Sequence, residues 1–303
     1  MHKIAIFIFG LILLTGSFRA QTDTTFDTNS KKRKIAFLST SGVVTLGSLV
    51  GLNQAWYNEY NTGKFHFFND NKEWQQMDKA GHLFTTYQMG RLLINDCYRA
   101  GFNKKQQLII GGGMGFAYMT AIECMDGFSR GWGFSWGDQL ADVIGTSLAI
   151  AQHAIWNEQR FQIRFSYAQS GLAAYNPNLL GKNYYTQILK DYNAQTYWLS
   201  FNPFSFIEKY PKFPKWLNLS FGYGAYGMLG GYTNQFLVKD ANGNILKIER
   251  VRRYYLSFDV DLTKIKTKSK VLKRVFSAFN ILKFPAPAIE LSSKKLRFYP
   301  IYY

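Results

Sequence analysis

Three motifs decide the fold: Asp78-Lys79-Ala80-Gly81-His82, Glu123-Cys124-Met125-Asp126-Gly127 and Ser135-Trp136-Gly137-Asp138-Gln139-Leu140-Ala141-Asp142. They place ionisable side chains at helical spacing within segments that are otherwise apolar. Burying a charged side chain costs free energy unless it is paired with another group or with a ligand. The stretch therefore predicts helices whose polar side chains interact with one another or with a bound ligand.

The order of the helices predicts that these charged residues meet. Three pairs share a helix face because their members are three or four residues apart: Asp78 with His82, Glu123 with Asp126, and Asp138 with Asp142. The first pair begins its helix, the second ends the next helix, and the third begins the one after. In an up-down bundle these three ends lie on the same side. We therefore expect one polar cluster, made of Asp78, Lys79, His82, Glu123, Asp126, Asp138 and Asp142.

Three hypotheses explain such a cluster. It could bind a divalent metal, with His82, Glu123 and Asp142 as the leading candidate ligands and Asp126 and Asp138 as further carboxylates. It could be a catalytic site in which His82 and Glu123 act as acid and base on an envelope lipid or glycan, with Asp138 and Asp142 as further candidates. It could be a satisfied polar network that fixes the helices. The third is favoured, with no cofactor, because the motifs lack the Glu-x-x-His spacing of di-iron bundles and an evident nucleophile.

Residues 35–158 predict a four-helix, membrane-associated bundle. Residues 35–58 contain no charged side chain and are long enough to span a bilayer, although a buried helix of a soluble bundle has the same pattern. Gly47 and Gly51 in this segment are spaced for close helix contact. The other helices are expected at about 76–99, 105–125 and 135–157, where Gly111 to Gly115 provide small residues for packing and not a dinucleotide-binding loop.

Residues 159–303 predict an antiparallel β-sheet or partial barrel, which makes the fold class α+β. Apolar and polar residues alternate in 161–167, and four further segments have the composition of strands: 197–201, 217–226, 253–262 and 296–303. A hairpin is expected around the turn at 240–244. About six strands is fewer than the eight of the smallest membrane barrels, so a complete barrel is not expected.

A basic amphipathic helix is predicted at about 264–283. Its apolar face would consist of Val271, Leu272, Val275, Phe276 and Phe279, with Lys268, Lys270, Lys273 and Arg274 on or beside the other face. Such a helix suits an anionic membrane surface. It could equally cover the sheet, and the sequence does not decide between these two interpretations.

The amino terminus predicts export. Residues 1–20 have the charged, apolar and small-residue regions of a cleavable signal peptide, and 21–34 resemble a polar tether. No Cys follows the apolar region, so a lipid anchor there is not expected. The net charge of +17, about +15 after cleavage, favours membrane lipid or an anionic envelope polymer as partner over nucleic acid. Cys97 and Cys124 are expected to be two buried free thiols.

At the three motifs the chain resembles a known family. Asp78-Lys79-x-x-His82, Glu123-x-x-Asp126-Gly127 and Ser135-Trp136-x-Asp138-x-x-x-Asp142-x-x-Gly145 are similar to the YfiM-like family of uncharacterised predicted periplasmic lipoproteins, and distantly to VanZ-like membrane proteins. The similarity covers about residues 36–155. It implies a helical core and an envelope location but no established activity, and the chain departs from it in lacking the Cys of a lipoprotein signal.

These observations predict an exported envelope protein with a structural or accessory role at the membrane, with a further envelope protein as a potential partner. The alternative is a lipid- or glycan-modifying enzyme that uses the His82 cluster. Export and extensive β structure favour the outer membrane or its periplasmic face. The uncharged helices keep the inner membrane as the alternative.

Overall fold

The computed structural model describes residues 28–54, 63–207, 213–234, 238–239 and 245–302. The predicted signal peptide and residues 21–27 of the predicted tether lie outside this part of the chain. The fold is of the mixed α+β class, as predicted, and the chain divides into two compact units. We call Asn71–Gly81 with Arg160–Tyr303 the sheet unit, and His2–Asp70 with His82–Gln159 the helical unit.

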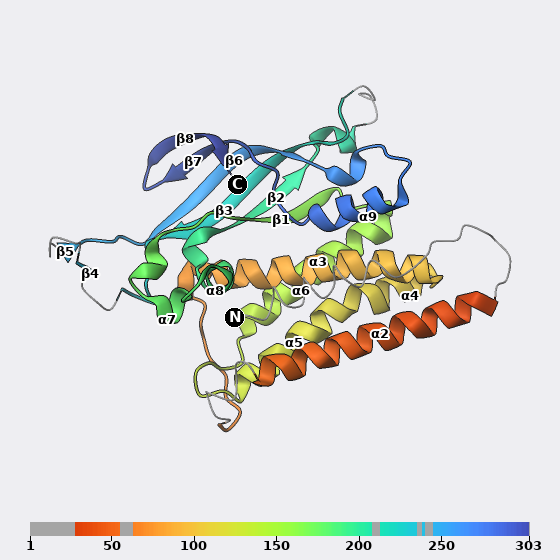
Figure 1. Ribbon diagram of the computed structural model, residues 1–303, viewed down its shortest axis with the longest axis horizontal. Helices are drawn as coiled ribbons and strands as arrows, with labels where there is room; N and C mark the ends of the chain where they lie inside the picture. Colours follow the sequence, from red (N-terminus) through yellow and green to blue (C-terminus); the bar gives the residue numbers. More distant parts are fainter. Residues whose placement is uncertain (1–27, 55–62, 208–212, 235–237, 240–244, 303) are drawn as a thin grey trace. The chain divides into compact units, whose positions relative to one another are not determined.

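The helical unit contains helical structure at the four segments expected between residues 35 and 158, but the helix expected at 105–125 is divided into three elements. Residues 55–58 of the first expected helix lie outside the described part of the chain. The elements are α2 (Thr28–Leu52), α3 (Met77–Ala100, of which His82 onward belongs to this unit), α4 (Lys104–Gln106), a π-helical turn (Gln107–Gly112), α5 (Gly113–Gly127) and α6 (Trp136–Trp156) (Figure 1). Ser135 caps α6 as predicted, because its side chain accepts a hydrogen bond from the Asp138 amide. Helix α2 begins earlier than expected, so residues 28–34 of the predicted tether are helical. Lys and Arg in that stretch are good helix formers.

Glycines allow α3 to pack closely against two neighbours. A β-carbon on Gly145 of α6 would lie 2.3 Å from the carbonyl oxygen of Leu83, and one on Gly111 would lie 2.7 Å from the backbone of Ile94. By contrast, among the described residues no atom lies within 4 Å of a β-carbon built on Gly47 or Gly51. The prediction of close helix contact at those two glycines was wrong. The buried side of α2 is a different face, marked by Phe37, Ser41 and Leu52.

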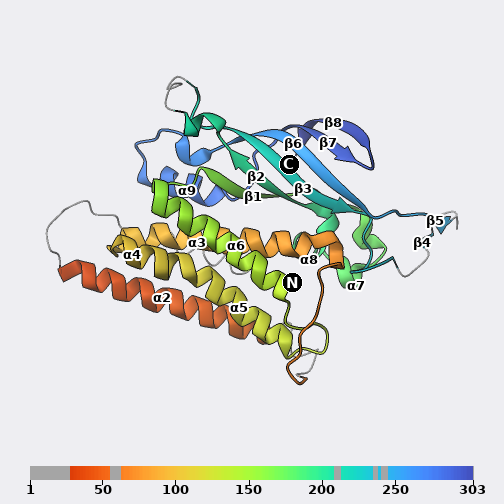
Figure 2. The same cartoon turned by 180° about the vertical axis from the view of Figure 1, so that it is seen from behind.

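The sheet unit contains an open, six-stranded antiparallel sheet in the order β1-β2-β3-β6-β7-β8 (Figure 2). Its strands are β1 (Phe161–Tyr167), β2 (Gln195–Phe201), β3 (Leu217–Tyr226), β6 (Val251–Val260), β7 (Ala286–Ser292) and β8 (Lys295–Tyr302). The expected hairpin is the separate pair β4 (Val238–Lys239) and β5 (Ile245–Leu246). Strand β7 was not predicted. Its Pro287 lacks an amide hydrogen for the ladder, and the register shifts between Ala286 and Ala288.

A short helix, Glu73–Gln76, precedes α3. Short helices also connect the strands: Leu172–Ala174, α7 (Pro177–Leu180), α8 (Tyr184–Lys190), Tyr192–Ala194, Pro203–Phe206 and Leu262–Lys264. The basic amphipathic helix is α9 (Lys270–Phe279), shorter than the predicted 264–283 because Ser269 caps its start and Asn280 ends it. After α9 the chain runs along the free edge of β1. The Phe165 amide donates to the Ile281 carbonyl at 3.0 Å, and the Lys283 amide donates to the Phe165 carbonyl at 2.8 Å.

Both cysteines are free, but only Cys97 is buried. The expectation that Cys124 is buried was wrong. The buried face of α5 includes Tyr118, Ile122, Glu123 and Asp126, and position 124 points away from it.

Candidate functional site

His82 is the centre of a buried polar group inside the helical unit. Its Nδ1 lies 3.2 Å from Oδ1 and 3.3 Å from Oδ2 of Asp142. The imidazole comes from α3 and the carboxylate from α6, and Asp142 has no exposed surface. A carboxylate at Nδ1 fixes the orientation of the ring and directs Nε2 to the opposite side.

Two further carboxylates lie on the Nε2 side. Glu123 of α5 places Oε1 3.7 Å from Nε2, and Asp138 of α6 places Oδ2 4.0 Å from it. These separations exceed hydrogen-bond length, but they are short enough for strong attraction if the ring is protonated, because all four residues are buried. The structure thus brings His82, Glu123, Asp138 and Asp142 together.

Ser135 holds this group in place. Its side chain caps α6 through the Asp138 amide at 3.2 Å and donates to Oδ1 of Asp70 at 2.6 Å. Its own amide donates to Oε2 of Glu123 at 3.0 Å. Asp70 was missed from the sequence because it lies in a loop without helical or strand periodicity, and only the tertiary contact with Ser135 identifies it.

Of the other three predicted members of the cluster, Asp78 and Lys79 belong to the sheet unit and Asp126 to the helical unit. The Asp78 carboxylate accepts a hydrogen bond from the Tyr192 hydroxyl and lies 3.9 Å from the Lys79 ammonium, and all three residues belong to the sheet unit. Asp126 is buried near the end of α5, where its backbone carbonyl accepts a hydrogen bond from the Ser129 amide at 2.9 Å.

The composition of the His82 group limits its chemistry. With all three acids ionised, even a protonated imidazole leaves the four groups with a charge of −2. A buried charge excess of this kind is costly unless protons or a cation balance it. The arrangement can therefore hold shared protons, transfer a proton through Nε2, or provide nitrogen and oxygen ligands to a divalent cation.

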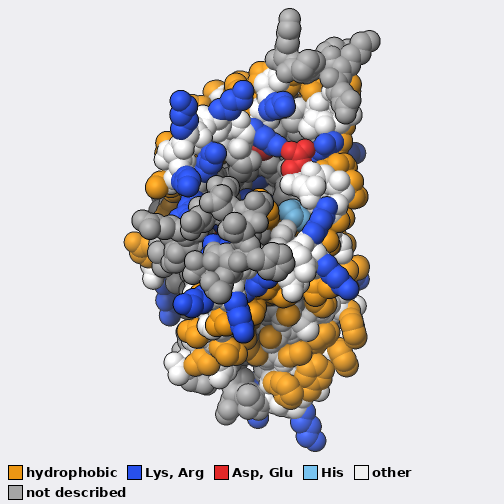
Figure 3. All heavy atoms as spheres, turned by 90° about the vertical axis from the view of Figure 1, so that its right-hand side faces the viewer, with side chains coloured by type: hydrophobic (Ala, Val, Ile, Leu, Met, Phe, Trp, Pro, Cys, Tyr) orange, Lys and Arg blue, Asp and Glu red, His pale blue; other side chains and the backbone are white. Residues whose placement is uncertain are grey.

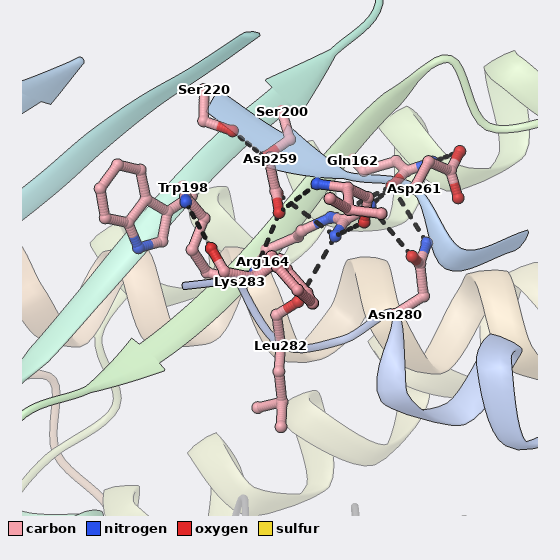
Figure 4. A network of polar contacts seen from close by, with 12 residues as sticks. Gln162, Arg164, Trp198, Ser200, Ser220, Asp259, Asp261, Asn280, Leu282 and Lys283 are labelled. Carbon is pink, nitrogen blue, oxygen red and sulfur yellow. Dashed lines mark hydrogen bonds and ion pairs between the residues drawn. The ribbon is translucent and has the colours of Figure 1, made fainter. Parts of the chain in front are cut away.

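The sheet unit has a second buried polar network that the sequence did not reveal (Figure 4). Arg164 and Asp259, neither of them exposed, form an ion pair with Nη1 3.2 Å from Oδ2. Arg164 also donates to the Val260 carbonyl at 2.8 Å and to Oδ1 of Asn280 at 3.0 Å. Nearby, the Lys283 ammonium donates to two backbone carbonyls at 2.6 and 2.7 Å, and burial lowers the pKa of Lys283 to about 8. These saturated contacts are typical of a structural network.

The fold and the His82 group define a mixed α+β protein whose helical unit encloses an imidazole–carboxylate cluster. Residues 66–154 match the family model described as "Predicted periplasmic lipoprotein (DUF2279)", and this range contains all four residues of that cluster. The match is to an uncharacterised family of predicted periplasmic lipoproteins, and it supports an exported envelope location. No curated protein and no solved structure matches the chain.

Two described helical stretches, Ser30–Leu52 and Lys104–Gly127, are long and apolar enough to cross a membrane. The first lies near the amino terminus, where signal sequences have the same properties, and core helices of soluble proteins share them too. Length and composition alone therefore give weak evidence for membrane insertion.

Proposed function

We propose that this chain is an exported, membrane-associated envelope protein with a structural or accessory role. In this proposal α2, α3, α5 and α6 act as one bundle at the membrane, and the His82 group fixes the helices to one another. The observation that carries the proposal is the reversed polarity of α6, whose polar side chains are buried and whose apolar side chains are exposed.

Helix α6 carries most of its polar residues on the inside: Asp138, Gln139, Asp142, Thr146 and Gln152 are buried, whereas Ser147 is exposed. Its large exposed residues are apolar: Trp136, Leu140, Val143, Ile144 and Ile155. A surface helix of a water-soluble protein has the opposite pattern. Polar groups facing the interior and apolar groups facing outward are expected in a lipid environment.

Helix α2 supports the same proposal. Its exposed large residues are Ile35, Leu38, Val43, Leu46 and Val50, which are between 46% and 71% exposed. Figure 3 shows one side of the molecule, where hydrophobic side chains form patches at the surface and Lys and Arg are scattered over the rest. Exposed apolar patches of this kind mark contact with a membrane or a partner.

The His82 group suits a structural role because it joins three helices. One imidazole from α3 lies between carboxylates from α5 and α6, and all of them are buried. In an apolar surrounding such a network favours one arrangement of the helices over others. The YfiM-like and distant VanZ-like resemblance fits an envelope role, and the extensive β structure leads us to propose the outer membrane or its periplasmic face, with the inner membrane as the alternative.

Site-directed labelling tests the proposal. The two native cysteines are first removed by Cys97→Ala and Cys124→Ser. In this background, Val143→Cys places a single cysteine on the exposed face of α6. Lys105→Cys, at another exposed position, is the matched control. In washed membranes we expect a water-soluble maleimide to label position 105 and to leave position 143 unlabelled until detergent is added. Equal labelling of both positions, or release of the protein by an alkaline wash, would contradict membrane embedding.

A second candidate function is favoured by the orientation of His82. Asp142 at Nδ1 directs Nε2 towards Glu123 and Asp138, an arrangement that suits a divalent cation or acid–base catalysis on an envelope lipid or glycan. Elemental analysis of the purified protein tests it, with Glu123→Gln and His82→Gln variants as controls. Stoichiometric metal in the native protein that is lost in both variants, while folding is retained, would support this candidate over the purely structural one.

A further inference from the structure

The strand register shows that one face of the six-stranded sheet is apolar from edge to edge. Residues directly paired on neighbouring antiparallel strands lie on the same face. One such row crosses all six strands: Ile163, Leu199, Phe221, Leu256, Ile289 and Phe298. A neighbouring row continues it with Tyr223, Tyr254, Leu291 and Leu296. We call this side of the sheet the apolar face.

The opposite side of the sheet is polar and buried. There the paired residues Gln162, Ser200, Ser220 and Ser257 form a row of four hydrogen-bonding side chains. Arg164, Asp259 and Glu290 lie on the same side and are also buried. The curled sheet lets Tyr302 of β8 reach Thr196 of β2, with 2.9 Å between their hydroxyl oxygens. The interior of this unit thus contains a polar network beside buried aromatic rings such as Trp198, as in Figure 4.

Ile163 on β1 is buried, but the members of the first row on β2, β3, β6, β7 and β8 are exposed. This is the reverse of a sheet in a water-soluble protein. Leu256, Ile289 and Phe298 are 41%, 44% and 65% exposed. Alternation with polar residues inward and apolar residues outward is the pattern of strands in contact with lipid. A contiguous exposed apolar surface otherwise calls for a covering partner.

The open edges of the sheet limit how deeply it can enter a bilayer. An unpaired strand edge carries backbone amides and carbonyls that have no hydrogen-bond partner in hydrocarbon. Strand β8 pairs with β7 alone among the described strands, so the sheet is not closed. The geometry therefore favours a sheet that lies at the membrane surface with one face turned to the acyl chains, and not a sheet that spans the membrane.

The charge of the segment that follows β6 indicates the kind of membrane. Residues 262–285, which lie between β6 and β7 and include α9, contain seven Lys and Arg and no Asp or Glu; of the seven, Lys283 is buried. On α9 itself Val271, Leu272, Val275 and Phe279 are 40–68% exposed, so these residues do not cover the sheet. An exposed apolar helix face flanked by cations suits the interface of an anionic bilayer.

We propose that the apolar face of the sheet and the apolar side of α9 form a peripheral docking surface for an anionic phospholipid bilayer. The inference extends the proposed function, since it assigns a second lipid-facing surface to the unit that does not contain the His82 group. Anionic headgroups would meet the exposed cations Lys266, Lys268, Lys270 and Lys273, and the acyl chains would meet Leu256, Ile289 and Phe298.

Spin labels on the full chain test this surface. The chain with Cys97→Ala and Cys124→Ser receives single cysteines at Leu256, Ile289 or Phe298, with Lys295→Cys on β8 as the exposed control. Each labelled protein is reconstituted into vesicles of phosphatidylcholine and phosphatidylglycerol. Collision with dissolved oxygen and with a water-soluble nickel chelate is then measured at each position. We expect high oxygen and strongly reduced nickel collision at the three sheet positions, and full nickel collision at position 295.

Several results would overturn the inference. Nickel collision as high at the sheet positions as at 295 means that the face is in water. Shielding from both oxygen and nickel means that protein covers it. Equal protection in vesicles of phosphatidylcholine alone overturns the assignment to an anionic bilayer. A label at Val143 of α6 separates this from the proposed function: protection at 143 without protection on the sheet refutes only the present inference, whereas water exposure at 143 refutes membrane embedding of the helical unit.

Discussion

The Nδ1 atom of His82 lies 3.2 Å from Oδ1 of Asp142, although the two residues are sixty positions apart, and both are buried. This contact joins α3 to α6 and orients the ring towards Glu123 and Asp138. Its strength decides whether the His82 group mainly stabilises the helices, and double-mutant cycles measure it.

For the pair His82 and Asp142 we expect a coupling free energy of about 1.5–3 kcal/mol, the range for a hydrogen bond to a charged group. The variants are His82→Ala, Asp142→Ala and the double variant, compared by denaturant unfolding in detergent. Gln107→Ala combined with His82→Ala is the control, because the side-chain hydrogen bonds of Gln107 go to the Phe102 carbonyl and to His153. If the stability losses of the His82→Ala and Asp142→Ala variants simply add up in the double variant, the contact between the two residues contributes little to the free energy of unfolding.

Gly145→Ala should destabilise the helical unit, because the new β-carbon would lie 2.3 Å from both the Leu83 carbonyl and the Thr86 hydroxyl. Moving α6 away from α3 is expected to cost about 1–3 kcal/mol, as for other overpacked sites. Gly113→Ala is the matched control: among the described residues nothing lies within 4 Å of its added β-carbon, and helix propensity predicts no loss. Thermal unfolding of both variants checks the prediction, which fails if their midpoints agree.

Ser135→Ala should lower stability by about 1–2 kcal/mol. The change removes the cap of α6 and the hydrogen bond to Asp70. Ser135→Thr retains a hydroxyl group and should recover most of the loss. Chemical denaturation of the two variants is the measurement, and an alanine variant as stable as the threonine one would contradict the role of the hydroxyl.

Removing one partner of the Arg164–Asp259 pair should cost about 3–5 kcal/mol, because the other charge then remains buried without its counterion. Asp259→Asn keeps the size of the side chain and isolates the charge. The exposed pair of Lys247 and Glu249 is the control, so Glu249→Gln should change the free energy of unfolding by less than about 1 kcal/mol. If Asp259→Asn and Glu249→Gln lowered the free energy of unfolding by similar amounts, the burial of the Arg164–Asp259 pair would be refuted.

Lys283 should make stability depend on pH. Its pKa is lowered from 10.5 to about 8 in the folded protein by burial, so between these values the unfolded chain binds more protons than the folded chain. Stability contributed by this residue therefore rises as pH increases from about 8 towards 10.5, by at most about 3 kcal/mol. Comparing unfolding free energies of the native protein and Lys283→Met at several pH values isolates the effect. A difference that does not change with pH would contradict the lowered pKa.

Local patterns predicted most of the elements. Ser135 and Asp138 marked the start of α6, and the alternation in residues 161–167 marked β1, because caps and strand periodicity depend only on neighbouring residues. Strand β7 was missed because Pro287 within it and Pro285 just before it contradict strand composition. Gly47 and Gly51 were misinterpreted because spacing alone does not show which face of α2 is buried.

By itself, the sequence determined that His82, Glu123, Asp138 and Asp142 lie near helix ends on the same side of the helical unit. Helix order and helix length fix the height of each residue along the helix axes. Only the tertiary structure decided that Asp70 reaches Ser135 and that Asp78 bonds to Tyr192, because such contacts join segments with no common periodicity. It also decided that Arg164 and Asp259 lie inside the sheet and Leu256 and Phe298 outside it. Alternation places residues on two faces of a strand, but the curl of the sheet and the packing around it determine which face is buried.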